Sequence, residues 1–84
     1  MFKLTRLDDN HIITGIYSSA VLYDEDKIYK EVMGERPIKG CSMVIARGIN
    51  SYWITTEITE ILEDTQNYVR FKTKNSLYEW KIIK

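Results

Sequence analysis

The sequence has few of the residues on which most metal and redox chemistry depends. It contains one cysteine, one histidine and one proline among 84 residues. With Cys41 alone, no intramolecular disulfide can form. The common zinc sites need several histidine or cysteine ligands at short spacing. The sequence therefore predicts neither a disulfide framework nor a structural metal.

Long apolar runs are also missing. No stretch approaches the ~18 apolar residues of a membrane-spanning helix, and no signal peptide is apparent. Together with the single cysteine, this predicts a cytoplasmic protein with no membrane association. Twelve basic residues balance twelve acidic ones. The whole chain therefore has no net electrostatic attraction for nucleic acid or for an anionic membrane.

Candidates for catalysis are equally sparse. A nucleophile, a base and an orienting group could come only from Cys41, His11 and Asp8 or Asp9. A free cysteine, however, is usually a buried small hydrophobe. The four glycines are scattered rather than gathered in a phosphate-binding loop. The acidic run 24–26 lacks the spaced oxygen ligands and the glycine of a calcium loop. We therefore expect no enzymatic activity, no metal and no cofactor.

The residues that are present predict β-structure, most clearly in a hairpin over residues 68–83. Apolar or threonine side chains alternate with basic ones over 69–74, and a second alternating run covers 77–82. Between them lies Asn75, a residue type that tolerates the left-handed backbone of a tight turn. The predicted buried face consists of Val69, Phe71, Thr73, Tyr78, Trp80 and Ile82.

Two turns can join these runs. A turn at 74–75 places Arg70 opposite Glu79, whereas a turn at 75–76 places Arg70 opposite Lys81. Like charges directly opposite one another destabilise a strand pair by a few tenths to about 1 kcal/mol. We therefore favour the turn at 74–75.

Further strands are predicted where β-branched and apolar residues concentrate between turn residues. Gly15 predicts a bulge or tight bend, and a change in the alternation of apolar residues predicts another near Thr59 and Glu60. Segment 18–33 has two interpretations: two strands joined at the acidic run 24–26, which we favour, or a short helix capped by Ser18 or Ser19. The predicted strands are 1–7, 11–17, 41–47 and 52–62, and the predicted turns are 8–10, 34–40, 48–51 and 63–67.

About five to seven short strands with regular turns are typical of a small sandwich or barrel. Barrel closure removes the exposed edges of a short open sheet. We therefore predict one all-β domain over residues 1–84, a strongly curved SH3-like barrel, with an OB-like barrel as the alternative.

Two parts of the sequence carry a family resemblance. Residues 55–61 (TTEITEI) and 69–78 (VRFKTKNSLY) resemble small, mostly uncharacterised all-β proteins of bacteria and their phages, which pair a threonine-led strand with an F-x-T-x-N-S-x-Y hairpin. The resemblance covers about the last forty residues and brings no catalytic residue. It implies a short accessory protein of a mobile element that binds, and often blocks, a host protein such as a CRISPR or other defence complex.

Two sets of residues are candidates for partner binding. Tyr52 and Trp53 are adjacent, so their side chains point to opposite faces of a strand, and an exposed Tyr or Trp is a typical interface anchor. The second set is the outward face of the hairpin, whose basic side chains suit single-stranded nucleic acid or simply keep a strand soluble. This face offers Tyr68, Arg70, Lys72, Lys74 and Lys81.

The function predicted from these features is a non-enzymatic module that binds a host protein or protein complex and inhibits it. The first alternative is a small-barrel protein that binds single-stranded nucleic acid through Arg70, Lys72 and Lys74. The second alternative is a homo-oligomeric structural protein that pairs its sheet edges.

Overall fold

The computed structural model describes residues 1–23, 29–48 and 50–83, and these residues form strands without any helix. The all-β prediction is therefore confirmed. The helical alternative for 18–33 is wrong, because strands occupy 17–23 and 29–34; the turn expected at 24–26 lies outside the described residues. The strands are β1 (Phe2–Arg6), β2 (His11–Gly15), β3 (Tyr17–Tyr23), β4 (Tyr29–Gly34), β5 (Ser42–Gly48), β6 (Ser51–Ile54), β7 (Ile58–Thr65), β8 (Tyr68–Thr73) and β9 (Leu77–Ile82).

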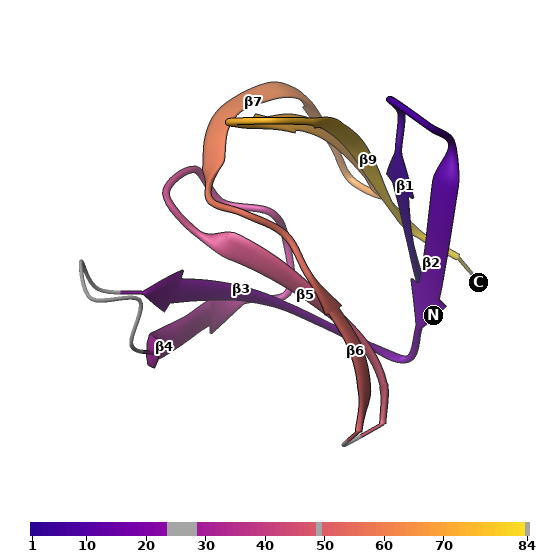
Figure 1. Ribbon diagram of the computed structural model, residues 1–84, viewed down its shortest axis with the longest axis vertical. Helices are drawn as coiled ribbons and strands as arrows, with labels where there is room; N and C mark the ends of the chain where they lie inside the picture. The colour runs from indigo at the N-terminus through magenta and orange to yellow at the C-terminus, as the bar shows by residue number, and fades with distance from the viewer. Residues whose placement is uncertain (24–28, 49, 84) are drawn as a thin grey trace.

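The strands form two antiparallel sheets. One has five strands in the order β2-β1-β9-β8-β7, and the other has four in the order β4-β3-β5-β6. The two sheets face each other, with β7 and β9 on one side and β3 and β5 on the other (Figure 1). Strand β5, predicted over 41–47, lies between β3 and β6.

The hydrophobic core lies between the two sheets. Trp80 and Phe71 from the five-stranded sheet are 0% exposed, as is Met43 from the four-stranded sheet. The Trp80 indole Nε1–H donates to Ser18 Oγ at 2.9 Å, and this hydroxyl donates to the Glu35 carbonyl oxygen at 2.8 Å. A hydrogen-bonded chain thus satisfies the one polar group of the largest core side chain, which would otherwise be costly to bury.

The C-terminal hairpin has the register that the charges favoured. Arg70 lies opposite Glu79 and Phe71 lies opposite Tyr78, with ring centroids 5.2 Å apart. The Thr73 N–H donates to the Ser76 carbonyl oxygen at 2.9 Å, which closes the turn at 74–75. The predicted buried face of the hairpin is confirmed.

The chain passes from one sheet to the other at Gly15, where the sequence predicted a bulge or bend. The Ile16 N–H donates to the Ala46 carbonyl oxygen at 3.0 Å, so β2 and β3 meet β5 at this corner. A Cβ atom added to Gly15 would lie 2.5 Å from that same oxygen. Gly15 is therefore required by the close approach of the Ala46 backbone.

A second corner replaces the single strand that was predicted over 52–62, so that prediction is wrong. Strand β6 ends at Ile54 and β7 begins at Ile58. Between them Thr55 is buried, and its Oγ1 accepts the Met43 N–H at 3.0 Å while its own N–H donates to the Met43 carbonyl oxygen at 2.9 Å. This double contact with Met43 holds the corner that directs β7 into the other sheet.

Strand β7 extends beyond the predicted end at Leu62 to Thr65, which shortens the turn expected over 63–67. Its pairing with β8 shifts register between Ile58 and Glu60, where the bulge was predicted, and again between Ile61 and Glu63.

Arg36 closes one end of the molecule. Its guanidinium donates to the carbonyl oxygens of Thr65 and Gln66, each at 2.6 Å, and pairs with Asp64. The same group lies over the Trp80 ring, 5.4 Å from the centroid. Arg36 thus ties the segment after β4 to the turn between β7 and β8 and covers the core tryptophan.

Candidate partner-binding surfaces

The four-stranded sheet has one side against the core and one side away from it. Trp53 pairs with the buried Ile45 and points inward, so its neighbours Tyr52 and Ile54 point outward. The same alternation and the strand registers place the rest of the outward side chains. We call this surface the outer face; it consists of Tyr17, Ser19, Val21, Tyr23, Val32, Ser42, Val44, Ala46, Tyr52 and Ile54.

The ten described side chains of the outer face include no charged one. Tyr52 is 64% exposed, Tyr17 59% and Val32 52%. Val21 is only 5% exposed and is not part of the core cluster between the sheets. A contiguous uncharged surface with large exposed side chains is typical of an interaction site.

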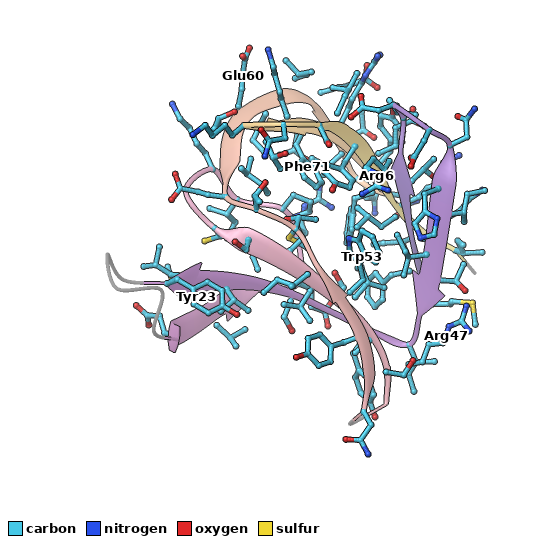
Figure 2. The ribbon with its side chains drawn as sticks, viewed as in Figure 1. Arg6, Tyr23, Arg47, Trp53, Glu60 and Phe71 are labelled. Carbon is cyan, nitrogen blue, oxygen red and sulfur yellow. The ribbon has the colours of Figure 1, made fainter. Side chains whose placement is uncertain are left out.

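One end of the outer face is hollowed. The hollow has a volume of about 430 Å³ and is lined in part by three outer-face residues, Tyr23, Ser42 and Ile54. Figure 2 shows Tyr23 on the four-stranded sheet, away from the core residue Phe71. A hollow of this size, which Glu57 also lines, can hold a large apolar side chain of a partner.

A second hollow lies where the two sheets part. We call it the seam groove; it has a volume of about 220 Å³ and runs between β2 and β6. Trp53 is half-buried there, with its ring 5.1 Å from the His11 ring and 5.3 Å from the Arg6 guanidinium carbon. Figure 2 shows Arg6 and Trp53 pointing toward one another between the sheets. The lining residues are His11, Ile12, Ile13, Thr14, Ile45, Arg47, Ser51, Tyr52 and Trp53.

The two arginines near the seam groove have different partners. Arg6 makes two contacts with the Asp9 carboxylate, at 3.0 and 2.7 Å, which lower the pKa of Asp9 to about 2. Arg47 instead donates to the Thr14 carbonyl oxygen at 3.0 Å and to its Oγ1 at 3.3 Å. The charge of Arg6 is therefore neutralised in place, whereas Arg47 is held by neutral acceptors.

The outward face of the hairpin is less basic than its sequence suggests. Arg70 lies between Glu63 on β7 and Glu79 on β9, and Lys72 lies opposite Glu60. Figure 2 shows Glu60 pointing outward from β7. Tyr68 donates its hydroxyl to the Glu79 carboxylate. Strand pairing thus places carboxylates beside Arg70 and Lys72, whereas Lys74 is exposed in the turn.

The contact with Glu79 predicts an unusual titration of Tyr68. Partial burial, reinforced by the hydrogen bond to Glu79, raises the pKa of Tyr68 from 10.0 to about 12. Because the pKa of Tyr68 is higher in the folded state than in the unfolded state, the protonated Tyr68 stabilises the fold. This contribution to the free energy of unfolding is complete below about pH 10 and is lost as the pH rises through about 12. In an ultraviolet titration of phenolate absorbance, Tyr68→Phe should remove a step near pH 12, and Glu79→Gln should move that step toward 10. A wild type without a phenolate step near pH 12 would contradict this contact.

Of the residues named as candidates for catalysis, Asp9 accepts the backbone N–H of His11 at 3.2 Å, whereas Cys41 lies in the buried core. Cys41 is 2% exposed, and burial raises the pKa of its thiol, with further contributions from Glu57 and Glu31. The reactive thiolate is thereby disfavoured. His11 is exposed at the seam groove beside Trp53.

Within residues 1–23, 29–48 and 50–83, no group of three or more His, Cys, Asp and Glu side chains could hold a metal ion. The acidic run 24–26 lies outside these ranges. The same residues include no helix with the length and hydropathy needed to cross a membrane. Comparisons of the chain with protein-family models, curated proteins and solved structures found no match.

Proposed function

We propose that this protein is a non-enzymatic binding module that recognises a protein partner through the outer face. The observation that carries the proposal is the absence of charge from the ten described side chains of that face, together with the exposure of Tyr17, Tyr52 and Ile54. Apolar surface gains roughly 25 cal/mol for each Å² removed from water. A partner that covers this face would remove its apolar side chains from water, and this burial favours binding.

The chemistry of the surface suits a protein more than a small molecule. Two exposed tyrosines, Tyr17 and Tyr52, flank Ala46 in neighbouring strands, and each combines a large apolar ring with a hydroxyl that can hydrogen-bond. Aromatic residues of this kind dominate the binding energy of protein interfaces. The hollow beside Ile54 adds a place for an apolar anchor of the partner.

The proposed biological role is that of a mobile-element accessory protein that inhibits a host complex by occupying one of its surfaces. Such a role requires a binding face and no catalytic group. The family resemblance of the C-terminal half supports the same role.

The proposed fold type is a small SH3-like barrel. Two stretches of chain, β2–β3 and β6–β7, each contribute to both sheets. Following these stretches and the strand pairs from β1 through β5 and β8 to β9 leads back to β1. This cyclic order supports a closed arrangement.

Binding of nucleic acid through the hairpin face has less support. Affinity for a nucleic acid backbone rests on clustered bases that release counterions. Glu60, Glu63 and Glu79 lie beside Arg70 and Lys72 in the strand registers. We therefore treat nucleic acid, and a second copy of this chain, as outcomes to be tested against a protein partner.

A charge on the outer face tests the proposal. Ile54→Glu, at a 42% exposed position, should leave the fold intact but weaken retention of a host protein by about tenfold or more, because a carboxylate would be desolvated in the interface. The measurement is affinity capture from the host, followed by titration of the captured protein.

Lys72→Gln on the hairpin face is the matched control and should bind as the wild type does. Equal binding by Ile54→Glu and the wild type would contradict the proposal. A wild type that only self-associates, with monomeric Ile54→Glu, would assign the face to a homo-oligomer instead.

A further inference from the structure

The seam groove is bordered by strand edges with unpaired backbone groups. Strand β2 is the last strand of its sheet, and its Thr14 carbonyl oxygen points away from β1 to accept Arg47. Because backbone groups alternate in direction along a strand, the N–H and C=O of Ile12 point the same way. Ile12 has no neighbouring strand on that side among the described residues. This edge can therefore pair with an added strand.

Strand β6 borders the other side of the groove in the same manner. It is the last strand of the four-stranded sheet. The Thr55 N–H points toward β5, where it donates to Met43. The backbone groups of Ile54 and Tyr52 therefore point away from β5. The groove thus lies beside strand edges whose backbone groups can pair with an extended peptide.

The side chains of the groove present donors and no carboxylate. Arg47 has no acidic side chain within ion-pair distance in the part of the chain that the structure describes. The nearby Arg6 is already paired with Asp9. The Trp53 Nε1–H is shielded from solvent and has no acceptor among the described residues. A buried donor without an acceptor costs about 1–3 kcal/mol in general, so an incoming acceptor at this position would be stabilising.

From these features we propose that the seam groove binds an extended peptide segment of the partner that carries a carboxylate side chain. The segment pairs with the free edge at Ile12, and its carboxylate accepts from Arg47 and, after a small shift of the ring, from the Trp53 N–H. The inference rests on the proposed function, because the segment belongs to the protein partner. It adds the chemical class of the segment, acidic and extended, and a second contact surface.

A peptide fits these observations better than a nucleic acid does. Stacking of bases needs an open aromatic face, whereas the Trp53 ring already contacts Arg6 and His11. The only arginine that lines the groove is Arg47, too little positive charge for strong counterion release. The free strand edges offer backbone hydrogen bonds, which a peptide can match residue by residue.

The test uses a blocked peptide, acetyl-Thr-Val-Glu-Val-Thr-amide, and its Gln counterpart. The chain has two tryptophans and therefore two indole N–H signals in a ¹⁵N-resolved spectrum. The Trp53 signal, assigned with Trp53→Phe, should shift on titration, whereas the Trp80 signal, already bonded to Ser18, should stay in place. The Glu peptide should bind about tenfold more tightly than the Gln peptide.

Variants locate the carboxylate. Arg47→Gln should remove the preference for the Glu peptide, and Arg47→Lys should retain part of it, because lysine keeps the charge but loses the planar fork. Lys72→Gln on the hairpin face should change nothing. Amide spectra of each variant would show that the fold is intact.

Three results would overturn the inference: equal affinity for the Glu and Gln peptides, a shift of the Trp80 signal in place of Trp53, or an oligothymidylate that shifts Trp53 at the same concentrations. Failure of this inference is distinct from failure of the proposed function. If Ile54→Glu abolishes partner capture while Arg47→Gln leaves it unchanged, the outer face stands and the groove does not. If the Glu peptide binds the groove but Ile54→Glu captures the partner normally, only the outer face is removed.

Discussion

Gly15→Ala is expected to lower the free energy of unfolding by about 3 kcal/mol. The added Cβ would lie 2.5 Å from the Ala46 carbonyl oxygen, a backbone atom that cannot rotate away. Relief requires the corner between β2 and β3 to separate from β5, which strains the Ile16–Ala46 hydrogen bond. Urea denaturation followed by circular dichroism would measure the change.

Gly48→Ala is the matched control for this substitution. A Cβ at Gly48 would have no atom within 4 Å, so the change in stability should stay within about 0.5 kcal/mol. A domain of 84 residues is stable by roughly 4–13 kcal/mol, which makes the two outcomes easy to separate. Equal stabilities of the two variants would show that the corner does not have the close backbone contact described.

Trp80→Ala is expected to cost about 3–5 kcal/mol, enough to unfold much of a domain this small. The side chain is 0% exposed, stacks with Phe2 at a centroid distance of 5.7 Å and lies under the Arg36 guanidinium. Its removal leaves a cavity between the two sheets. It also removes the indole N–H that donates to the Ser18 hydroxyl. Thermal unfolding would measure the loss.

Two further variants serve as comparisons for Trp80→Ala. Trp80→Phe keeps most of the ring volume and loses the hydrogen bond to Ser18, so it should be intermediate between wild type and Trp80→Ala. Tyr52→Ala removes an aromatic side chain that is 64% exposed and should change stability by less than about 0.5 kcal/mol. A similar loss for Tyr52→Ala and Trp80→Ala would contradict the placement of the core.

The features that the sequence predicts well depend on neighbours in the chain. The hairpin register follows from Arg70 and Glu79, because their charges distinguish two turns only one residue apart. The bend at Gly15 follows from a glycine inside a β-branched run. The opposite orientation of Tyr52 and Trp53 follows from the alternation of any strand.

The features that sequence reasoning misses depend on contacts between distant segments. The break at Thr55 arises because its hydroxyl binds Met43, twelve positions earlier in the chain. Nothing local distinguishes this threonine from Thr56 or Thr59. The outer face cannot be recognised from the sequence for the same reason. Tyr17 and Tyr52 share a surface only after β3 and β6 have both paired with β5.

The mixed charge of the hairpin face is a further case. The alternation over 69–74 predicts a row of bases, but the carboxylates of Glu60 and Glu63 arrive from β7. Their position depends on the register of that strand, which two bulges change. A count of charges within one hairpin therefore overstates the positive charge of the folded surface.

The two corners make the sheets mutually dependent. β2 continues into β3, and β6 continues into β7. Each corner therefore links a strand of one sheet to a strand of the other, so unfolding of one sheet disturbs the other. We therefore expect melting to follow a single sharp transition in every spectroscopic probe. The outer face and the seam groove would then be lost together, at the temperature at which the two sheets separate.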